Sequence, residues 1–410
     1  MKTALVLSGG GARGAYQVGV YKALMKAKIE INIITGTSIG ALNGCMFVQG
    51  DYKKAYKMWN NLSFKSVLED AGEIDFKTFK GRNELFSKYV KALIKDGGFD
   101  ISKIEKTVKE SFNVYKFYYS NIDFGLVTVR FNDLKPIMLT KSDLNEETVV
   151  DYLVASATIF PAFQKKEIEE QIFIDGGYYD NLPIDLAIKM GAEKIIAVDL
   201  DAIGRKRNVE TDLEITYIKP KSNLGSFLNF DKKTAKRAID LGYNDAMKSL
   251  GYYEGEKFTF KKRHIYFNQL AYEENFKNNL NKFATFKTRV GNKIKESIYL
   301  GYIEGDYSEF VIEILDYLGT VFNLDETEVY GVFKFNNKIR NRFSKLHRVD
   351  SKRVSQIFKN KTINNLMDKK ALLKYIYSQL ENQNIEKLNV AAAIFPKEYI
   401  ASVYLYTIYN

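Results

Sequence analysis

The chain has 410 residues, of which 46% are hydrophobic and 27% charged, a composition that is typical of a folded protein and excludes a disordered one. This length allows about two to three domains, each large enough to bury a core. The net charge is +11, with +4 in residues 1–250 (36 basic against 32 acidic) and +7 in residues 251–410 (25 against 18). Because the positive charge is mild and spread over the chain, it favours a lysine-rich solvated surface over a surface that attracts anionic lipid head groups. No nucleic-acid-binding module is recognisable.

Cysteine and histidine are both scarce. Cys45 is the single cysteine, which excludes intrachain disulfides and cysteine-based metal clusters. The two histidines, His264 and His347, argue against a histidine-ligated metal site. The apolar run at the N-terminus ends at Ser8 and is too short for a signal peptide, and no segment reaches the ~18 apolar residues of a membrane span. We therefore expect a soluble cytoplasmic protein. We also expect no cofactor.

The first fifty residues have the pattern of a parallel sheet covered by helices. Residues 2–7 end in the apolar run 4–7 and predict a buried strand, and the glycine-rich run 9–14 turns into a helix expected over 15–28. A second strand is expected at 31–34 and a second buried helix at 41–48. Two successive strand-turn-helix units are the sign of an α/β fold.

The next region continues this pattern after a helical interruption. Residues 51–122 are mostly helical, with glycine breaks at Gly72, Gly81 and Gly97-Gly98, and form either a cap over a site or a simple insertion. Later strands are expected at 124–129, 136–140, 172–174 and 194–200, with an edge strand at 214–219, and helices at 146–157, from Pro183 to Gly191 and within 223–251.

The strand-helix alternation stops around residue 252. We therefore expect two domains: residues 1–252 as a three-layer α/β/α domain with a mainly parallel sheet, and residues 253–410 as a mainly helical domain of unknown role. Helices of the second domain are expected at 273–300, 308–322, 327–346, 352–360 and 369–383, while 399–409 is ambiguous between helix and strand.

A serine lies between the second strand and the second helix. In the stretch 36–40 (GTSIG), Ser38 is flanked two residues away by Gly36 and Gly40. This is the outline of a nucleophile elbow, in which a sharp strand-to-helix turn exposes the hydroxyl and the helix N-terminus faces the substrate. The pattern is weak by itself, because Gly-x-Ser-x-Gly also occurs by chance.

The glycine run after the first strand admits two interpretations. Its literal spacing also matches the dinucleotide-binding fingerprint, but that interpretation needs an acidic residue at the end of the second strand, where Thr35 and Gly36 stand. The alternative is an oxyanion hole, with backbone N–H groups presented to a developing negative charge. The oxyanion interpretation assigns the residues Gly9, Gly10, Gly11, Arg13 and Gly14.

An aspartate at the end of a later strand is the candidate base. Asp175 is followed by Gly176 and Gly177 and can reach the same edge of the sheet as Ser38. Of the other acidic residues nearby, Asp180 and Asp185 are expected to be turn or helix-start residues, and Asp199 and Asp201 are the runner-up bases.

Several motifs together carry a resemblance. They are GGGARG at 9–14, GTSIG at 36–40, DGG at 175–177 and DNLP at 180–183, with the looser ASATIFPAF at 155–163. In this order and context they resemble the patatin-like phospholipase family, over roughly residues 1–250. No such resemblance extends over 253–410.

The resemblance implies a Ser-Asp dyad without histidine, with Ser38 as nucleophile and Asp175 as direct proton acceptor. It implies a metal-independent lipid acyl hydrolase of the phospholipase A or lysophospholipase type that acts through an acyl-enzyme. The expected substrates are lipid acyl esters, above all phospholipids. Peripheral contact with a membrane is expected from this class of substrate. Two alternatives stay open. One is a Ser-Asp-His esterase that uses His264, and the other is a non-catalytic descendant that binds a lipid or a protein partner.

Overall fold

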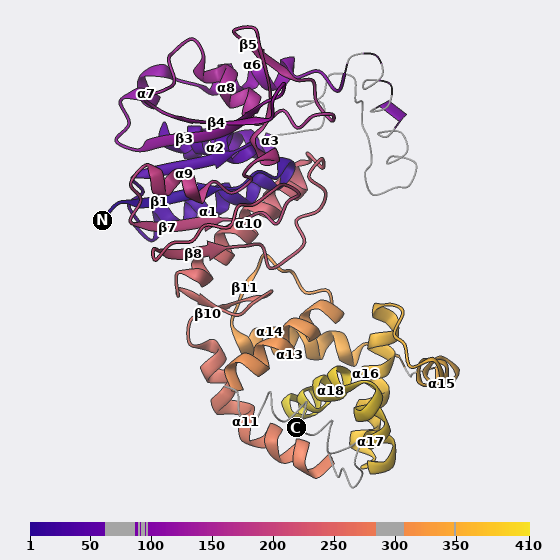
Figure 1. Cartoon of the computed structure of the whole chain (residues 1–410). Helices are drawn as coiled ribbons and strands as arrows, with labels where there is room; N and C mark the ends of the chain where they lie inside the picture. Colours follow the sequence, from indigo (N-terminus) through magenta and orange to yellow (C-terminus); the bar gives the residue numbers. More distant parts are fainter. Residues whose placement is uncertain (62–86, 89–90, 92–94, 96, 284–306, 348–349) are drawn as a thin grey trace. The chain divides into compact units, whose positions relative to one another are not determined.

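The computed structural model describes residues 1–61, 87–88, 91, 95, 97–283, 307–347 and 350–410 (Figure 1). The chain folds as two compact units, Met1–Ser249 and Leu250–Asn410. The sequence pattern placed the boundary after residue 252.

An eight-stranded sheet forms the centre of the described part of the first unit. Its strand order is β5-β6-β3-β2-β1-β7-β8, with β4 also paired to β3. The pairs β3-β2, β2-β1, β1-β7 and β7-β8 are parallel, and the pairs that involve β4, β5 and β6 are antiparallel. The strands are β1 (Thr3–Leu7), β2 (Ile33–Thr37), β3 (Asp123–Arg130), β4 (Lys135–Thr140), β5 (Lys166–Ile168), β6 (Gln171–Asp175), β7 (Lys194–Val198) and β8 (Glu214–Ile218).

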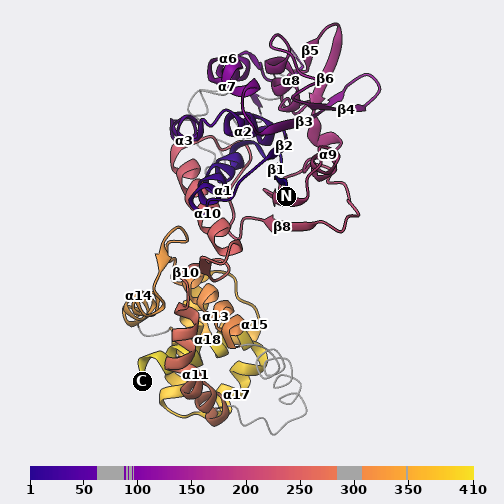
Figure 2. The ribbon, with the colours of Figure 1, turned by 90° about the vertical axis from the view of Figure 1, so that its left-hand side faces the viewer.

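Helices cover both faces of this sheet, as the expected three-layer α/β/α architecture requires. Successive side chains of a strand point to opposite faces. Val6 of β1 therefore packs in a cluster with Ile184 of α9 (Ile184–Lys189). On the other face, Leu7 and Ile34 lie against Gly44 of α2 (Ile39–Val48). Figure 2 shows α9 on one side of the central strands and α1 (Ala15–Lys26), α2 and α10 (Lys232–Ser249) on the other.

The first unit has further described helices, all of which follow β2 in the chain. They are α3 (Tyr52–Asn61), α6 (Ser102–Ser111), α7 (Val114–Tyr118) and α8 (Val149–Ser156). The expected mostly helical stretch 51–122 thus contains helices at both of its ends, while the breaks at Gly72 and Gly81 lie outside the described residues. Its assignment as a cap stays a prediction. The short strand β5 was not expected from the sequence.

The second unit is mainly helical, as expected, and has a small sheet that the sequence pattern did not indicate. The described helices are α11 (His264–Phe283), α13 (Tyr307–Val321), α14 (Val332–Ser344), α15 (Ser351–Asn360), α16 (Leu366–Glu381), α17 (Ile385–Ile394) and α18 (Pro396–Tyr409). The ambiguous segment 399–409 is therefore a helix. The prediction of one helix over 327–346 was wrong at its start, because Val329 and Tyr330 form strand β11 (Val329–Tyr330) beside β10 (Thr259–Lys261).

Two corrections concern the start of this unit. The helix predicted from residue 273 begins at His264, and its predicted part beyond residue 283 lies outside the described residues. Strand β9 (Tyr253–Glu254) pairs with β10 in the antiparallel sense and completes the small sheet. A continuous aromatic and aliphatic core, including Phe258, Phe335 and Tyr404, joins the sheet to the helices.

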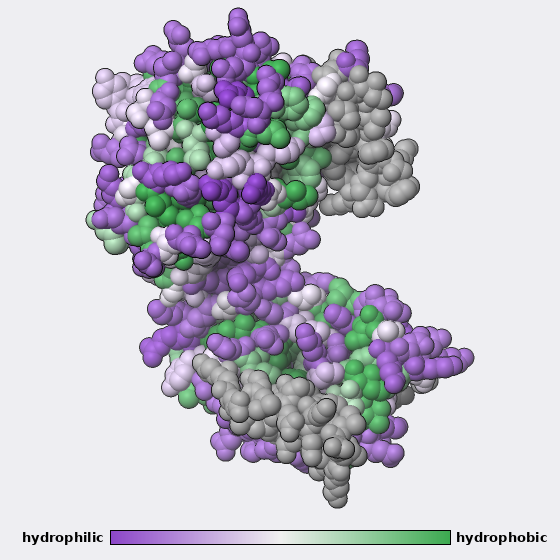
Figure 3. All heavy atoms as spheres, viewed as in Figure 1, coloured by the Kyte–Doolittle hydropathy of each residue, from purple (hydrophilic) through white to green (hydrophobic). Residues whose placement is uncertain are grey.

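Hydrophilic residues make up most of the face shown in Figure 3, with smaller apolar areas between them. Among the described residues, no helix combines the length and apolar character that a membrane span requires.

Candidate active site

Strand β3 aligns the ends of two other strands along one of its edges. Thr37, the last residue of β2, pairs with Val127, and Asp175, the last residue of β6, pairs with the next residue, Thr128. Because β2 is parallel and β6 antiparallel to β3, the carboxyl ends of the two strands meet head to head. Ser38 directly follows Thr37, so the pairing register brings Ser38 and Asp175 together.

Ser38 occupies a strained turn between β2 and α2. Its φ is 58° and its ψ is −129°, a backbone conformation that side chains other than glycine rarely adopt. The flanking glycines are required by close packing. A Cβ on Gly36 would lie 2.5 Å from the carbonyl carbon of Gly40, and a Cβ on Gly40 would lie 2.3 Å from the carbonyl oxygen of Leu7. The turn is sharp and tightly packed, and its assignment as a nucleophile elbow stays a prediction.

The backbone of the elbow is held by a serine that the sequence analysis did not single out. The N–H of Ser38 donates to Ser156 Oγ at 3.0 Å, and Ser156 Oγ donates to the carbonyl oxygen of Val127 at 2.7 Å. Ser156 is the last residue of α8 and is fully buried. It therefore ties the serine turn to β3, the strand that sets the pairing register.

Asp175 lies beside the Ser38 hydroxyl in a buried position. The Ser38 hydroxyl is near enough to the carboxylate to lower its pKa, and the N–H of Gly177 donates to Asp175 Oδ1 at 2.7 Å. Only 3% of the residue is exposed. Burial raises the pKa of Asp175 from its ordinary 3.8 to about 6, against the lowering effect of the Ser38 hydroxyl and the Gly177 N–H. The carboxylate is thus a stronger proton acceptor than a solvated aspartate, yet still ionised at neutral pH.

The glycine loop approaches Ser38 from the end of β1. A Cβ placed on Gly9 would lie 3.0 Å from Ser38 Cβ, so only glycine allows this approach. Its own N–H donates to the carbonyl oxygen of Asn181, and the N–H of Ala12 donates to Phe227. Within the described chain the N–H groups of Gly10 and Gly11 have no acceptor, and they are the candidate oxyanion donors of this loop. Gly14, the last residue of the loop's short 3-10 helix, packs against Ile39 and Trp59.

Arg13 has another role in the described contacts. Its Nε donates to the carbonyl oxygen of Gly225 at 3.0 Å, and one of its terminal nitrogens donates to that of Asp201 at 2.9 Å. These bonds fasten the glycine loop to two later segments. Arg13 therefore holds the loop in position through main-chain acceptors.

The other acidic candidates are engaged elsewhere. Asp199 lies 2.8 Å from Lys206 Nζ and 3.3 Å from Lys219 Nζ. Its burial works to raise its pKa, but these lysines and further hydrogen bonds leave the pKa below its usual value. Asp185 pairs with Lys189 and Arg207. Asp180 is buried, which raises its pKa to about 6, and its Oδ1 accepts from the N–H of Leu182.

His264 is part of the second unit. It is the first residue of α11, its Nδ1 accepts from the N–H of Val332 at 3.3 Å, and its ring packs against Phe267.

Asn181 is a second residue that the sequence analysis left without a role. Its side chain lies against the positions where Gly9 and Gly177 would carry a Cβ, at 2.3 and 3.1 Å, so it fills the space between the glycine loop and the Asp175 turn. Among the described residues its buried Nδ2 has no hydrogen-bond partner. Ser156 and Asn181 lie within the motif stretches 155–163 and 180–183. Their position in these motifs is the one sequence signal that could have identified them.

Comparisons with known proteins identify the family that the first unit matches. Residues 5–188 match the family described as patatin-like phospholipase. The mouse and human patatin-like phospholipase domain-containing protein 6 are each 30% identical over 223 residues, which is 52% of this chain and 14% of theirs. Lysophospholipase nte1 of Aspergillus terreus is 32% identical over 205 residues, which is 48% of this chain and 12% of its own. The first unit therefore contains a patatin-like phospholipase domain, and the chain spans about a seventh of the length of these relatives.

Two solved structures resemble the fold at low similarity. VipD from Legionella pneumophila has a TM-score of 0.40 and 13% identity, covering 100% of this chain and 91% of that chain. The type III effector protein ExoU has a TM-score of 0.31 and 13% identity, covering 96% and 80%. These likenesses concern the overall fold alone.

Proposed function

We propose that the first unit hydrolyses acyl esters of lipids through a Ser38-Asp175 dyad. The observation that carries the proposal is that the pairing register along β3 brings Ser38, on a strained turn, together with the buried carboxylate of Asp175. The patatin-like phospholipase domain and the lysophospholipase relative support the choice of lipid esters as substrates.

The first step is acylation of Ser38. Asp175 accepts the hydroxyl proton while Ser38 Oγ attacks the ester carbonyl carbon, and the carbonyl oxygen gains the negative charge. The N–H groups of Gly10 and Gly11, together with the N-terminus of α2, stabilise this oxyanion. Collapse of the tetrahedral intermediate transfers the proton from Asp175 to the departing alcohol, which leaves an ester between the acyl group and Ser38.

The second step is deacylation by water. Asp175, now ionised again, accepts a proton from the attacking water, and the same N–H groups stabilise the second oxyanion. Ser38 then leaves with that proton and the fatty acid is released. A pKa of about 6 suits both halves of this cycle, because Asp175 is ionised at neutral pH but can hold a proton transiently.

A lipid substrate would bring the protein to a lipid surface, so peripheral membrane contact belongs to the proposal. Sedimentation with phospholipid vesicles of neutral and anionic composition tests this part separately. If the protein binds neither kind of vesicle yet hydrolyses lipid monomers, the contact part fails while the hydrolase part stands.

The central experiment compares the wild-type protein, Ser38→Ala and Asp175→Asn. We expect a fluorophosphonate probe to label the wild-type protein and not Ser38→Ala, and ester hydrolysis to fall by about 10³-fold or more in both variants. Folding of the variants is checked by circular dichroism. A wild-type protein that neither reacts with the probe nor hydrolyses any ester contradicts the proposal, and labelling that persists in Ser38→Ala identifies a different nucleophile.

A further inference from the structure

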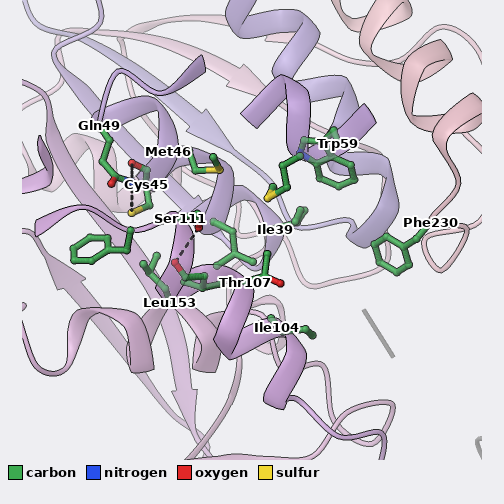
Figure 4. A pocket seen from close by; sticks show the side chains of 14 residues that line it. Ile39, Cys45, Met46, Gln49, Trp59, Ile104, Thr107, Ser111, Leu153 and Phe230 are labelled. Carbon is green, nitrogen blue, oxygen red and sulfur yellow. Dashed lines mark hydrogen bonds between the residues drawn. The ribbon is translucent and has the colours of Figure 1, made fainter. Parts of the chain in front are cut away.

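An apolar pocket begins at Ile39, the residue that follows Ser38 in the chain, and runs along α2 (Figure 4). Along this helix its lining residues are Ile39, Leu42, Cys45, Met46 and Gln49. Leu42, Cys45 and Gln49 are spaced by three and four positions, which places them on one helix face, and Leu42 follows Ser38 by four residues. Ser38, Ile39 and Leu42 are only partly buried, whereas the rest of α2 is buried.

Helix α6 forms the facing wall of this pocket. It contributes Ile104, Thr107, Val108 and Ser111, again at the spacing of one helix face. The N–H of Asn113 donates to Gln49 Oε1, so the end of α6 lies at the end of α2 that is remote from Ser38. Ser111 and Gln49 therefore mark the far end of the pocket. Further walls come from Met58, Trp59, Phe112, Leu153 and Phe230.

The polar groups of the lining are used within the protein. Thr107 Oγ1 donates to the carbonyl oxygen of Lys103, and Ser111 Oγ donates to that of Val108. Gln49 Nε2 donates to the carbonyl oxygen of Cys45, and Trp59 Nε1 donates to Asn43 Oδ1.

The lining of the pocket is also uncharged over its described residues. Burial raises the pKa of the Cys45 thiol, which therefore stays neutral. Such a surface favours an alkyl chain and disfavours a head group or a nucleotide, whose polar atoms would lose hydration without gaining partners.

We propose that this pocket holds the acyl chain of the ester that Ser38 cleaves, so that its far end limits the length of chain accepted. The inference rests on the proposed function. The eleven residue-to-residue steps from Ser38 to Gln49, at about 1.5 Å each, give this stretch a length of about 16 Å. We therefore expect a preference for long acyl chains over short ones.

The test narrows the far end without touching the dyad. Ser111→Phe places an aromatic ring there, and the loss of a hydroxyl that bonds only within its own helix turn costs little. The matched control is Lys109→Phe, which adds the same ring to an exposed position of α6 outside the pocket. Both variants, together with the wild-type protein, are assayed with p-nitrophenyl acetate, butyrate, octanoate and palmitate, and their folding is checked by thermal unfolding.

We expect Ser111→Phe to lower kcat/KM for the palmitoyl ester by about tenfold or more, the effect of roughly two methylene groups left in water, with butyrate hydrolysis changed less than about twofold. Lys109→Phe should leave the whole profile unchanged. An equal loss for all esters, or no change for any, overturns the pocket assignment while the hydrolase proposal stands. Should Ser111→Phe fail to fold, Ser111→Leu gives the same comparison with a smaller intrusion. A wild-type protein without activity on any of the esters overturns both proposals.

Discussion

A buried polar cluster in the first unit differs from one in the second unit in how its groups are hydrogen-bonded. In the first unit, Asp175 is buried with a pKa near 6 and Ser38 sits on a strained turn. In the second unit, the buried Tyr404 hydroxyl accepts hydrogen bonds from Asn268 Nδ2 at 2.6 Å and from Asn336 Nδ2 at 3.1 Å. Asn268 Oδ1 in turn accepts from the Tyr307 hydroxyl at 3.0 Å.

We infer that the difference separates polar groups that stabilise the fold from polar groups that take part in the proposed reaction. A buried network whose donors and acceptors are matched holds a core in one arrangement. A buried carboxylate with a raised pKa costs stability, and that cost persists where the carboxylate performs chemistry. The contrast predicts that substitutions in the first set change activity more than stability, and that substitutions in the second set do the reverse.

The largest expected effect is that of Asp175→Asn. We expect kcat/KM to fall by about 10³-fold, because the amide cannot accept the Ser38 proton. In the wild-type protein, kcat/KM should fall about tenfold per pH unit below a pKa of about 6, since only the ionised carboxylate is active. Stopped assays between about pH 4 and pH 8 measure both effects. A pH profile that stays flat through 6 would contradict the role of Asp175 as base.

The same substitution should stabilise the fold above pH 6. A folded pKa of about 6 instead of 3.8 means that the folded state prefers the protonated acid. Its contribution to stability is present below about pH 4 and is lost as the pH rises through 6, a loss on the order of 3 kcal/mol. Denaturant unfolding of both proteins should show the variant gaining on the wild type over this pH window. A difference that does not change with pH contradicts the buried ionised state.

Tyr404→Phe tests the matched network. It leaves the amide donors of Asn268 and Asn336 without their acceptor, and we expect a loss of about 3 kcal/mol in the free energy of unfolding of the second unit. Hydrolysis by the folded protein should change less than about twofold. Urea titration followed by circular dichroism measures the first, and assays well below the transition measure the second. Activity lost without a loss of stability would remove the distinction between the units.

Ser156→Ala tests whether the serine turn must be held in position. The N–H of Ser38 loses its acceptor, and we expect kcat to fall about tenfold with KM nearly unchanged. The matched control is Ser402→Ala in the second unit, another fully buried serine, whose Oγ donates to the carbonyl oxygen of Glu398 at 2.7 Å.

Both serine variants should lose about 1 kcal/mol of stability, and only Ser156→Ala should lose activity. Ser156→Thr, which keeps the hydroxyl, should recover part of the kcat if the hydrogen bond is responsible. An equal loss of kcat in both alanine variants would point to general destabilisation.

The smallest expected effect is that of His264→Gln. The histidine accepts a main-chain hydrogen bond in the second unit, and we expect ester hydrolysis to change less than about twofold. A loss of about 10³-fold would instead support a Ser-Asp-His triad and move part of the chemistry into the second unit.

Local sequence patterns carried much of the fold and the candidate dyad. The glycines around Ser38 and at residues 9–14 mark sharp turns, and a turn of this kind is legible from spacing alone. Alternation of strands and helices likewise indicated the three layers.

Contacts between segments that are distant in the chain could not be predicted from the sequence. The sequence indicated that Asp175 ends a strand, but whether β6 runs parallel or antiparallel to β3 depends on pairing across the sheet. Ser156 looks like any serine in a helix until its partner Ser38, 118 residues away, is known. The short strands β9 to β11 are set by pairing between segments too brief to show a period.

The pairing along β3 has a consequence for how the site can change over time. Val127 and Thr128 belong to neither member of the proposed dyad, yet their pairing with Thr37 and Asp175 determines how far Ser38 lies from its proposed base. One residue inserted between them would move the two strand ends apart by about 3.3 Å and reverse which face each later side chain occupies. Insertions in the surrounding loops leave this spacing intact, whereas a length change in the middle of β3 would end the reaction without altering either member of the dyad.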